Sequence, residues 1–221
     1  MKYAILIDGG FLKRKLDSQL YPLDVASVSA FLARVRAHQA LSGMSLHRVY
    51  WYDAPPLDIR VTKPLKGGRI NFGTTPLAKC SSLLLDQLSK LPFMSIRRGE
   101  VVFRGWRVRQ AALVHDENDV RLTADDLVPT IQQKGVDMRL GLDIASLTLK
   151  AQVEVIVLVT GDSDFVPAMK FARREGAQIF LISCGHALRP DMREHSDLLL
   201  ELDARDRQLT PEIEAILENV A

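Results

Sequence analysis

Residues 153–160 (VEVIVLVT) form an almost uninterrupted run of apolar residues, most of them β-branched. A strand with one face in water alternates apolar and polar residues, whereas a continuous run is typical of a central parallel strand covered on both faces. The covering layers of such a strand are helices. The run therefore predicts an α/β fold.

Segments typical of strands and of helices alternate along much of the chain. Short apolar runs at 3–7, 46–52, 177–183 and 198–202 predict further strands. Apolar residues recur at helical spacing in 24–40, 76–91, 136–150, 165–175 and 211–220. This alternation indicates a mainly parallel sheet flanked by helices.

One part of the chain, at about 55–125, interrupts the alternation. Residues 58–75 are irregular and basic, 94–110 are rich in strand-forming residues, and 122–130 are expected to form a turn or short helix. A length of 221 residues is that of one domain. We predict a single domain over 1–203 with a basic insertion at about 55–125, followed by a C-terminal helix within 204–221.

Aspartates occur where the sites of open α/β sheets form, at the carboxyl ends of the strands. Asp8 follows the first predicted strand, Asp162 and Asp164 follow the central one, and Asp137 lies at the start of a helix. Carboxylates that converge repel one another unless a cation or a proton offsets their charge. All-oxygen ligands suit Mg²⁺ or Mn²⁺, and these ions can activate water against a phosphodiester.

These aspartates also have purely structural interpretations. Asp8 could stabilise a turn, and Asp137 and Asp164 could cap helices. Asp143 follows Asp137 by six residues and lies on a different face of the same predicted helix. We therefore expect one of these two to bind metal directly, and favour Asp137.

Three segments, 5–12 (ILIDGGFL), 134–143 (KGVDMRLGLD) and 158–165 (LVTGDSDF), together resemble the motifs of the NYN domain family, the PIN-like nucleases that include the LabA-like proteins. The resemblance covers roughly 1–54 and 130–203. It implies a three-layer α/β/α sandwich and metal-dependent cleavage of RNA. The metal-binding acids it implies are Asp8, Asp137, Asp162 and Asp164, with Asp143 as a further candidate.

Phe11 departs from the pattern, because many members of the family carry Asn at this place. This leaves open an alternative function, a non-catalytic RNA-binding or regulatory module. A phosphatase of the haloacid-dehalogenase type, with Asp8 as nucleophile, is a weaker alternative. That chemistry needs a second acid two residues later, where Gly10 stands.

The net charge of +2 hides a strong asymmetry. Residues 1–110 hold 18 Lys and Arg against 7 Asp and Glu, a net charge of +11, and the remainder carries −9. The basic half could bind a nucleic-acid backbone, with Phe103 or Trp106 stacking on bases, or it could simply protect an edge strand. The predicted substrate-binding residues are Arg97, Arg98, Arg104, Arg107, Arg109, Lys134 and Ser163.

Other classes of protein are disfavoured. There is no apolar run long enough for a membrane span, and the N-terminal apolar run is too short for a signal peptide. Cys80 and Cys184 stand far apart, and the five histidines lack zinc-site spacing. We expect a cytoplasmic protein that uses Mg²⁺ or Mn²⁺, binds single-stranded or structured RNA and no membrane, and whose state as monomer or homodimer stays open.

Overall fold

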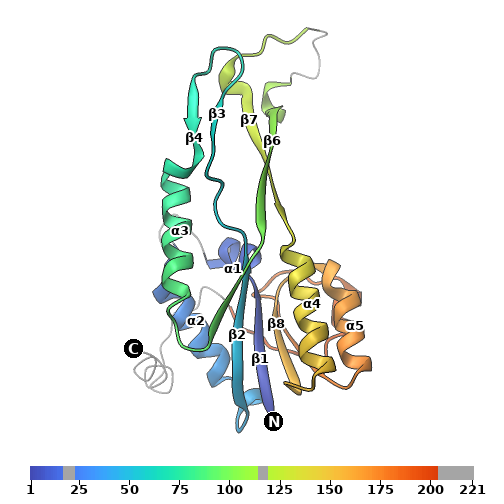
Figure 1. The fold of residues 1–221 in the computed structure, drawn as a ribbon. Helices are drawn as coiled ribbons and strands as arrows, with labels where there is room; N and C mark the ends of the chain where they lie inside the picture. Colours follow the sequence, from blue (N-terminus) through green and yellow to red (C-terminus); the bar gives the residue numbers. More distant parts are fainter. Residues whose placement is uncertain (17–22, 114–118, 204–221) are drawn as a thin grey trace.

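A six-stranded sheet in the order β10-β9-β8-β1-β2-β5 forms the centre of the molecule (Figure 1). All five neighbouring pairs are parallel. Its strands are β1 (Lys2–Asp8), β2 (Ser45–Asp53), β5 (Met94–Arg98), β8 (Val155–Val159), β9 (Gln178–Ile182) and β10 (Leu198–Leu199). The structure is a computed structural model that describes residues 1–16, 23–113 and 119–203, so the helix predicted at 211–220 lies outside the described residues.

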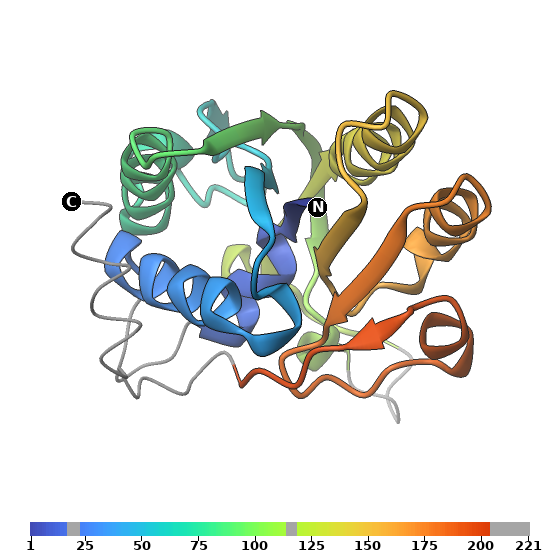
Figure 2. The same ribbon diagram turned by 90° about the horizontal axis from the view of Figure 1, so that it is seen from below.

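Helices cover both faces of the sheet (Figure 2). One core contains residues of α1 (Gly9–Leu16), α2 (Val25–Ala37) and α3 (Pro76–Leu88). The core on the other face contains residues of α4 (Val136–Leu149), α5 (Val166–Arg174) and α6 (Pro190–Glu194). The predicted three-layer α/β/α sandwich is therefore confirmed. Among the described residues, no helix is long and apolar enough to cross a membrane.

The central strand β8 explains the apolar run of the sequence. All five of its residues are fully buried. Val155, Val157 and Val159 enter the core beneath α1 and α2, whereas Ile156 and Leu158 enter the core beneath α4 and α5. Because neither face meets water, no position of the strand requires a polar residue.

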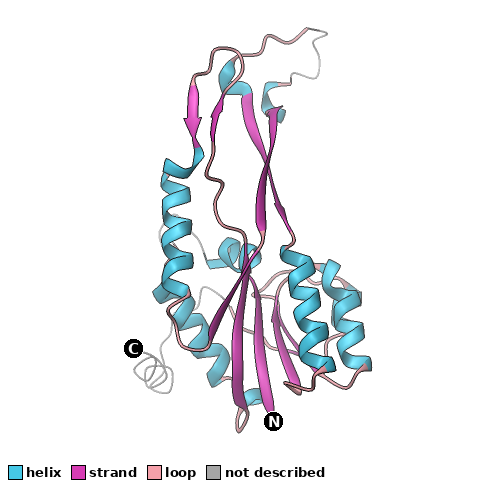
Figure 3. Ribbon diagram, viewed as in Figure 1, coloured by secondary structure: helices cyan, strands magenta, loops and turns pink. Residues whose placement is uncertain are grey.

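The segment predicted as one insertion at about 55–125 is divided in the structure. Its middle part, α3 and β5, belongs to the sandwich, since β5 pairs with β2 at the edge of the sheet. Two antiparallel strand pairs project beyond the carboxyl ends of β1 and β2 (Figures 1 and 3). We call them together the arm: β3 (Arg60–Thr62) with β4 (Arg69–Asn71), and β6 (Glu100–Val108) with β7 (Leu127–Lys134).

The turn or short helix predicted over 122–130 is wrong for most of that range. Only Ala124–Asp126 forms a 3₁₀ turn, and strand β7 begins at Leu127. The sequence of 127–134 shows no clear alternation of apolar and polar residues, because no residue of this strand is fully buried. Pairing with β6, rather than local sequence, makes this segment a strand.

Aromatic and basic side chains occupy opposite faces of the β6–β7 pair. The rings of Phe103 and Trp106 lie 5.7 Å apart, and both pack against Phe72, at 6.0 and 6.4 Å. The register against β7 shifts between Phe103 and Trp106, so both rings share one face. Arg107 follows Trp106 directly and points to the other side, and Arg104 Nε donates to Gln132 Oε1 (3.2 Å). The aromatic residues thus hold the two strand pairs together.

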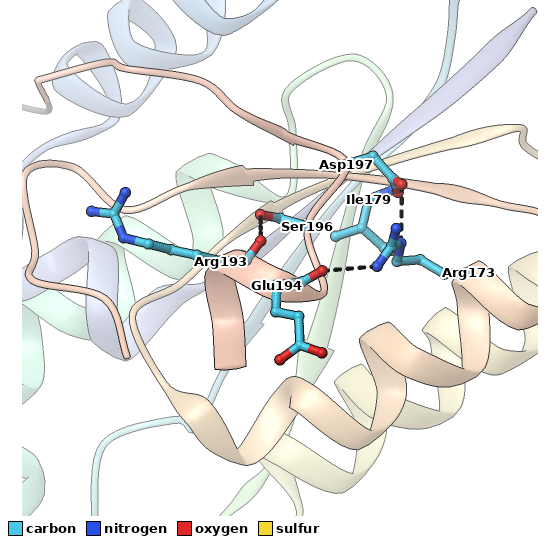
Figure 4. Close-up of polar contacts among 6 residues, drawn as sticks. All are labelled: Arg173, Ile179, Arg193, Glu194, Ser196 and Asp197. Carbon is cyan, nitrogen blue, oxygen red and sulfur yellow. Dashed lines mark hydrogen bonds and ion pairs between the residues drawn. The ribbon is translucent and has the colours of Figure 1, made fainter. Parts of the chain in front are cut away.

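A polar network fastens β10 and α6 to the sandwich (Figure 4). Asp197 accepts hydrogen bonds from the backbone N–H of Ile179 (2.7 Å) and from Arg173 Nε (3.0 Å). Arg173 also donates to the carbonyl of Glu194 (2.9 Å), and Ser196 donates to the carbonyl of Arg193 (3.0 Å). Ser196 and Asp197 therefore hold the final strand, β10, in position beside β9.

Candidate active site

Asp8 ends β1 and is held by two hydrogen bonds. Its Oδ1 accepts from the backbone N–H of Phe11 (2.9 Å), at the start of α1, and its Oδ2 accepts from Thr160 Oγ1 (3.2 Å). Thr160 is fully buried at the end of β8, and its Oγ1 accepts from the backbone N–H of Asp162 (3.1 Å). A continuous chain of hydrogen bonds thus joins Asp8 to the loop that carries Asp162.

Sequence reasoning missed Thr160. A hydroxyl residue that follows the central strand directly, ahead of Gly161 and Asp162, was the signal that could have identified it.

Asp162 and Asp164 lie in the loop after β8, and both are exposed. Asp162 Oδ1 accepts from the backbone N–H of Asp164 (2.9 Å) and so caps the 3₁₀ turn Ser163–Phe165. Asp164 does not cap the helix that follows, since the N-cap of α5 is Phe165 and makes no side-chain cap hydrogen bond. Asp137 does not cap its helix either: the N-cap of α4 is Gly135, whose φ of 72° lies in the left-handed region that favours glycine, and Asp137 follows in the first turn.

Burial and neighbouring negative charge raise the pKa of two of the aspartates, Asp8 and Asp137. Burial raises the pKa of Asp137 above its usual range, and the negative charges of Asp162 and Asp164 add to this. Burial also raises the pKa of Asp8, with a further contribution from Asp137. The hydrogen bonds from Phe11 and Thr160 and the charge of Arg14 oppose that rise. The structure thus brings Asp8, Asp137, Asp162 and Asp164 to one edge of the sheet.

A pocket of about 260 Å³ opens between α1 and the loop after β8. Its walls combine two carboxylates with cationic side chains and a hydroxyl, a mixture that suits a phosphate group held together with a cation. The lining residues are Asp8, Phe11, Arg14, Lys15, Gly161, Asp162, Ser163 and His186. Arg14 and Lys15 were not predicted, although the basic run that follows Asp8-Gly9-Gly10 by two residues was a visible signal.

Phe11 forms an apolar wall of this pocket. Its ring is buried and meets His186 edge to face, with the ring centroids 5.9 Å apart. Gly161 lies beneath both rings, because a Cβ at this position would come within 2.4 Å of His186 Cδ2 and 2.7 Å of Phe11 Cε2. The aromatic ring therefore packs the site where many family members carry a polar amide.

Asp143 and Arg97 lie apart from this pocket and bind each other. Asp143 Oδ2 accepts from Arg97 Nε (2.7 Å) and from the hydroxyl of Tyr52 (2.8 Å). The guanidinium of Arg97 also lies over the ring of Tyr50, 5.0 Å from its centroid. These contacts tie α4 to β2 and β5. They give no support to the predictions that Asp143 binds metal and that Arg97 binds substrate.

The other predicted substrate-binding residues lie at different distances from the site. Ser163 lines the pocket. Lys134 ends β7 and is exposed three residues before Asp137. The exposed Arg104 and Arg107 belong to the arm, Arg98 is the last residue of β5, and Arg109 follows β6 directly.

The donor chemistry of the site fits a divalent cation. Four carboxylates lie at one edge of the sheet, and carboxylate oxygens are the ligands that hard divalent cations prefer. Within the described residues, no three His, Cys, Asp or Glu side chains are grouped so as to hold a metal ion. The charge and the oxygen ligands of the site therefore suit a divalent cation. Asp8 and Asp162 share the pocket and are the pair best placed to hold the ion.

The raised pKa of Asp137 predicts how stability depends on pH in the metal-free protein. The native state holds this proton more tightly than the unfolded state, so the ionised group costs stability once pH rises above the ordinary Asp range near about 4. Urea unfolding in EDTA should show that the free energy of unfolding of Asp137→Asn increases, relative to that of wild type, as pH rises from about 3.5 to 7. The exposed Asp86→Asn serves as control; an equal trend in both variants would contradict the prediction.

Residues 98–199 match the family model of the NYN domain. No curated protein shows significant similarity to the chain. The crystal structure of a protein of unknown function from Vibrio parahaemolyticus is similar, with a TM-score of 0.50 and 12% identity, covering 91% of this chain and 93% of that one. This likeness concerns the fold alone.

NYN domains are PIN-like nucleases, and the matched range includes Asp137, Asp162 and Asp164. Residues 98–199, a little under half of the chain, are thus similar to the NYN domain family of PIN-like nucleases.

Proposed function

We propose that this protein is a metal-dependent endoribonuclease that hydrolyses phosphodiester bonds of RNA at the pocket between α1 and the loop after β8. The observation that carries the proposal is that Asp8 and Asp162 share one pocket with Arg14 and Lys15 at the carboxyl edge of a parallel sheet, with Asp137 and Asp164 at the same edge. Such edges are where α/β proteins place their sites. The match of residues 98–199 to the NYN domain, a family of nucleases, supports the same activity.

Some side chains of the pocket would bind the cation, and others would bind the phosphate. Asp8 and Asp162 would hold Mg²⁺ or Mn²⁺, with Asp137 and Asp164 adding negative charge nearby. The bound ion supplies positive charge that stabilises the phosphodiester and makes water a stronger nucleophile. Arg14 and Lys15 neutralise the phosphate, while Thr160 keeps the carboxylate of Asp8 oriented through its hydrogen bond.

The direct test is an incubation of the purified protein with single-stranded and structured RNA, each in Mn²⁺ or in EDTA. We expect internal cleavage of RNA in Mn²⁺ and none in EDTA, and DNA of the same sequence, tested alongside, measures the preference for RNA. Binding without cleavage in Mn²⁺ would instead establish the non-catalytic alternative. Release of phosphate from small phosphomonoesters, lost in Asp8→Asn, would establish the phosphatase.

The arginines on the outer face of the arm are expected to bind the RNA backbone. Replacing Arg104 and Arg107 together with Gln should weaken binding of single-stranded RNA. It should also lower the slope of log affinity against log salt by about 1.4, since each phosphate contact contributes about 0.7. Filter binding across a range of salt concentrations measures both quantities.

The matched control is Lys150→Gln, which removes a cation at the end of α4 opposite to Asp137. An unchanged salt slope in the arginine variant, or the same change in the control, would show that the arm does not contact phosphates.

A further inference from the structure

A second pocket, of about 330 Å³, lies where the arm meets the sandwich. Its volume is in the range of sites that bind small molecules, about 300–1,000 Å³. One wall is α3, with Leu77, and the opposite wall is β7, with Ile131. Both side chains are well exposed, at 77% and 43%, although they are large and apolar. The arm therefore builds a cavity that the sandwich alone does not have.

The floor of this pocket offers few hydrogen-bond donors. It consists of the loop after β2 and includes Pro55 and Pro56, neither of which has a backbone N–H. Lys13 reaches the rim, but its ammonium group forms an ion pair with the buried Asp53. The pocket thus suits a flat, apolar group, and its polar contacts come mainly from its edges, where Gln133 and Ser81 lie.

Gln133 connects this pocket to the aspartates. A Cβ built on Gly10 would lie 3.4 Å from Asp8 Oδ1 and 4.0 Å from Gln133 Oε1. One short stretch of α1 therefore separates the apolar pocket from the pocket that contains Asp8 and Asp162. A chain whose phosphate lies at Asp8 can place a neighbouring group between α3 and β7.

We propose that the pocket between α3 and β7 binds one unstacked base of a single-stranded polynucleotide beside the phosphate held at Asp8. A nucleobase has apolar faces that pack between side chains such as Leu77 and Ile131, and a polar edge that the Gln133 amide can hydrogen-bond. Arg14 and Lys15, on the helix between the two pockets, supply the charge complementary to the adjoining phosphate. A base in a duplex is stacked and paired, so the pocket selects single strands.

This inference rests on the proposed function in one respect, namely that the occupant belongs to a polynucleotide. Its test needs no cleavage. A single-stranded oligoribonucleotide with one 2-aminopurine is titrated with the protein in EDTA, and the fluorescence and the dissociation constant are recorded. Leu77→Asp is compared with Leu83→Asp, because both change an exposed leucine of α3 but only Leu77 lines the pocket.

We expect Leu77→Asp to weaken binding by about 5-fold or more and to remove the fluorescence increase of the unstacked base, whereas Leu83→Asp changes binding less than about 2-fold. Ser81→Leu, which fills the pocket without adding charge, should act as Leu77→Asp does. Circular dichroism and thermal unfolding confirm that each variant is folded.

Equal binding and equal fluorescence in the Leu77 and Leu83 variants would overturn the base pocket, even if wild-type protein cleaves RNA. A wild-type protein that binds with the expected pattern but never cleaves would instead refute the nuclease proposal and leave the base pocket standing. Equally tight binding of an oligonucleotide with an abasic site at the labelled position would also overturn the pocket.

Discussion

Replacing Asp162 with Asn is expected to lower the rate of RNA cleavage in saturating Mn²⁺ by about 100-fold or more. The change removes one carboxylate of the pair that shares the pocket with Arg14 and Lys15. An Asn side chain can still accept the hydrogen bond from the backbone N–H of Asp164, so the 3₁₀ turn keeps its cap. Single-turnover kinetics measure the effect on chemistry, and calorimetric titration with Mn²⁺ measures the effect on the ion.

Asp86→Asn is the control for this experiment. Asp86 is an exposed aspartate of α3 that pairs with Lys90, and it lies outside both pockets. Its replacement should leave cleavage and Mn²⁺ binding unchanged. If Asp162→Asn cleaves as fast as Asp86→Asn, the loop after β8 is not part of the catalytic site. If it loses cleavage but binds Mn²⁺ normally, Asp162 acts on the substrate rather than on the ion.

Replacing Lys13 with Met is expected to lower the free energy of unfolding by about 3–5 kcal/mol, because it leaves a buried carboxylate without its cation. Asp53 is fully buried at the end of β2, where it accepts hydrogen bonds from the backbone N–H of Ala54 (2.9 Å) and from Trp51 Nε1 (3.4 Å). Its ion pair with Lys13 fastens α1 to β2. Urea unfolding at neutral pH measures the loss.

Two further variants separate the burial of the charge from the loss of the lysine. Lys90→Met breaks an exposed ion pair and should cost less than about 1 kcal/mol. The double variant Lys13→Met, Asp53→Asn no longer buries an unpaired charge and should recover part of the loss. A Lys13→Met protein as stable as Lys90→Met would show that water or another group compensates Asp53.

The buried pair also has consequences for the candidate site. α1 begins directly after Asp8, and the same helix carries Arg14 and Lys15 into the pocket. Loosening α1 should therefore displace the cations that face the phosphate as well as the hydrogen bond from Phe11 to Asp8. Sequence analysis did not identify Asp53 or Lys13, because one acid after a strand and one lysine in a basic run are ordinary surface features in sequence.

Local sequence patterns were sufficient to predict the parallel sheet and most of the aspartates at its carboxyl edge. The apolar run of β8 could be recognised because burial on both faces favours an apolar residue at every position of the strand. Asp8, Asp162 and Asp164 could be placed near one another because they follow parallel strands, and β1 and β8 are indeed neighbours. Asp137 was placed at a helix start by the same reasoning, and its pKa responds to Asp162 and Asp164.

Most of the arm was beyond such reasoning. The residues of 94–110 did predict strand structure, and β6 lies there. The other strands of the arm are short or half-exposed, so they carry no strong periodic pattern, and each becomes a strand only through its partner. The aromatic residues predicted to stack on bases instead pack against Phe72, a residue that is remote in sequence. A pattern within one strand shows which side chains share a face, but it does not show what covers that face.

The sequence by itself determined the α/β class, the central strand and the position of Asp8, Asp162 and Asp164 at the carboxyl edge, because these follow from burial period and from the rule that parallel strands end together. The three-layer sandwich was implied by the resemblance of three segments to the NYN domain family. Tertiary structure alone decided that Asp143 binds Tyr52 and Arg97, which are 91 and 46 residues away along the chain. It also decided that α3 and β7 enclose an apolar pocket beside Asp8. Both depend on contacts between distant segments, whose geometry no local pattern of residues records.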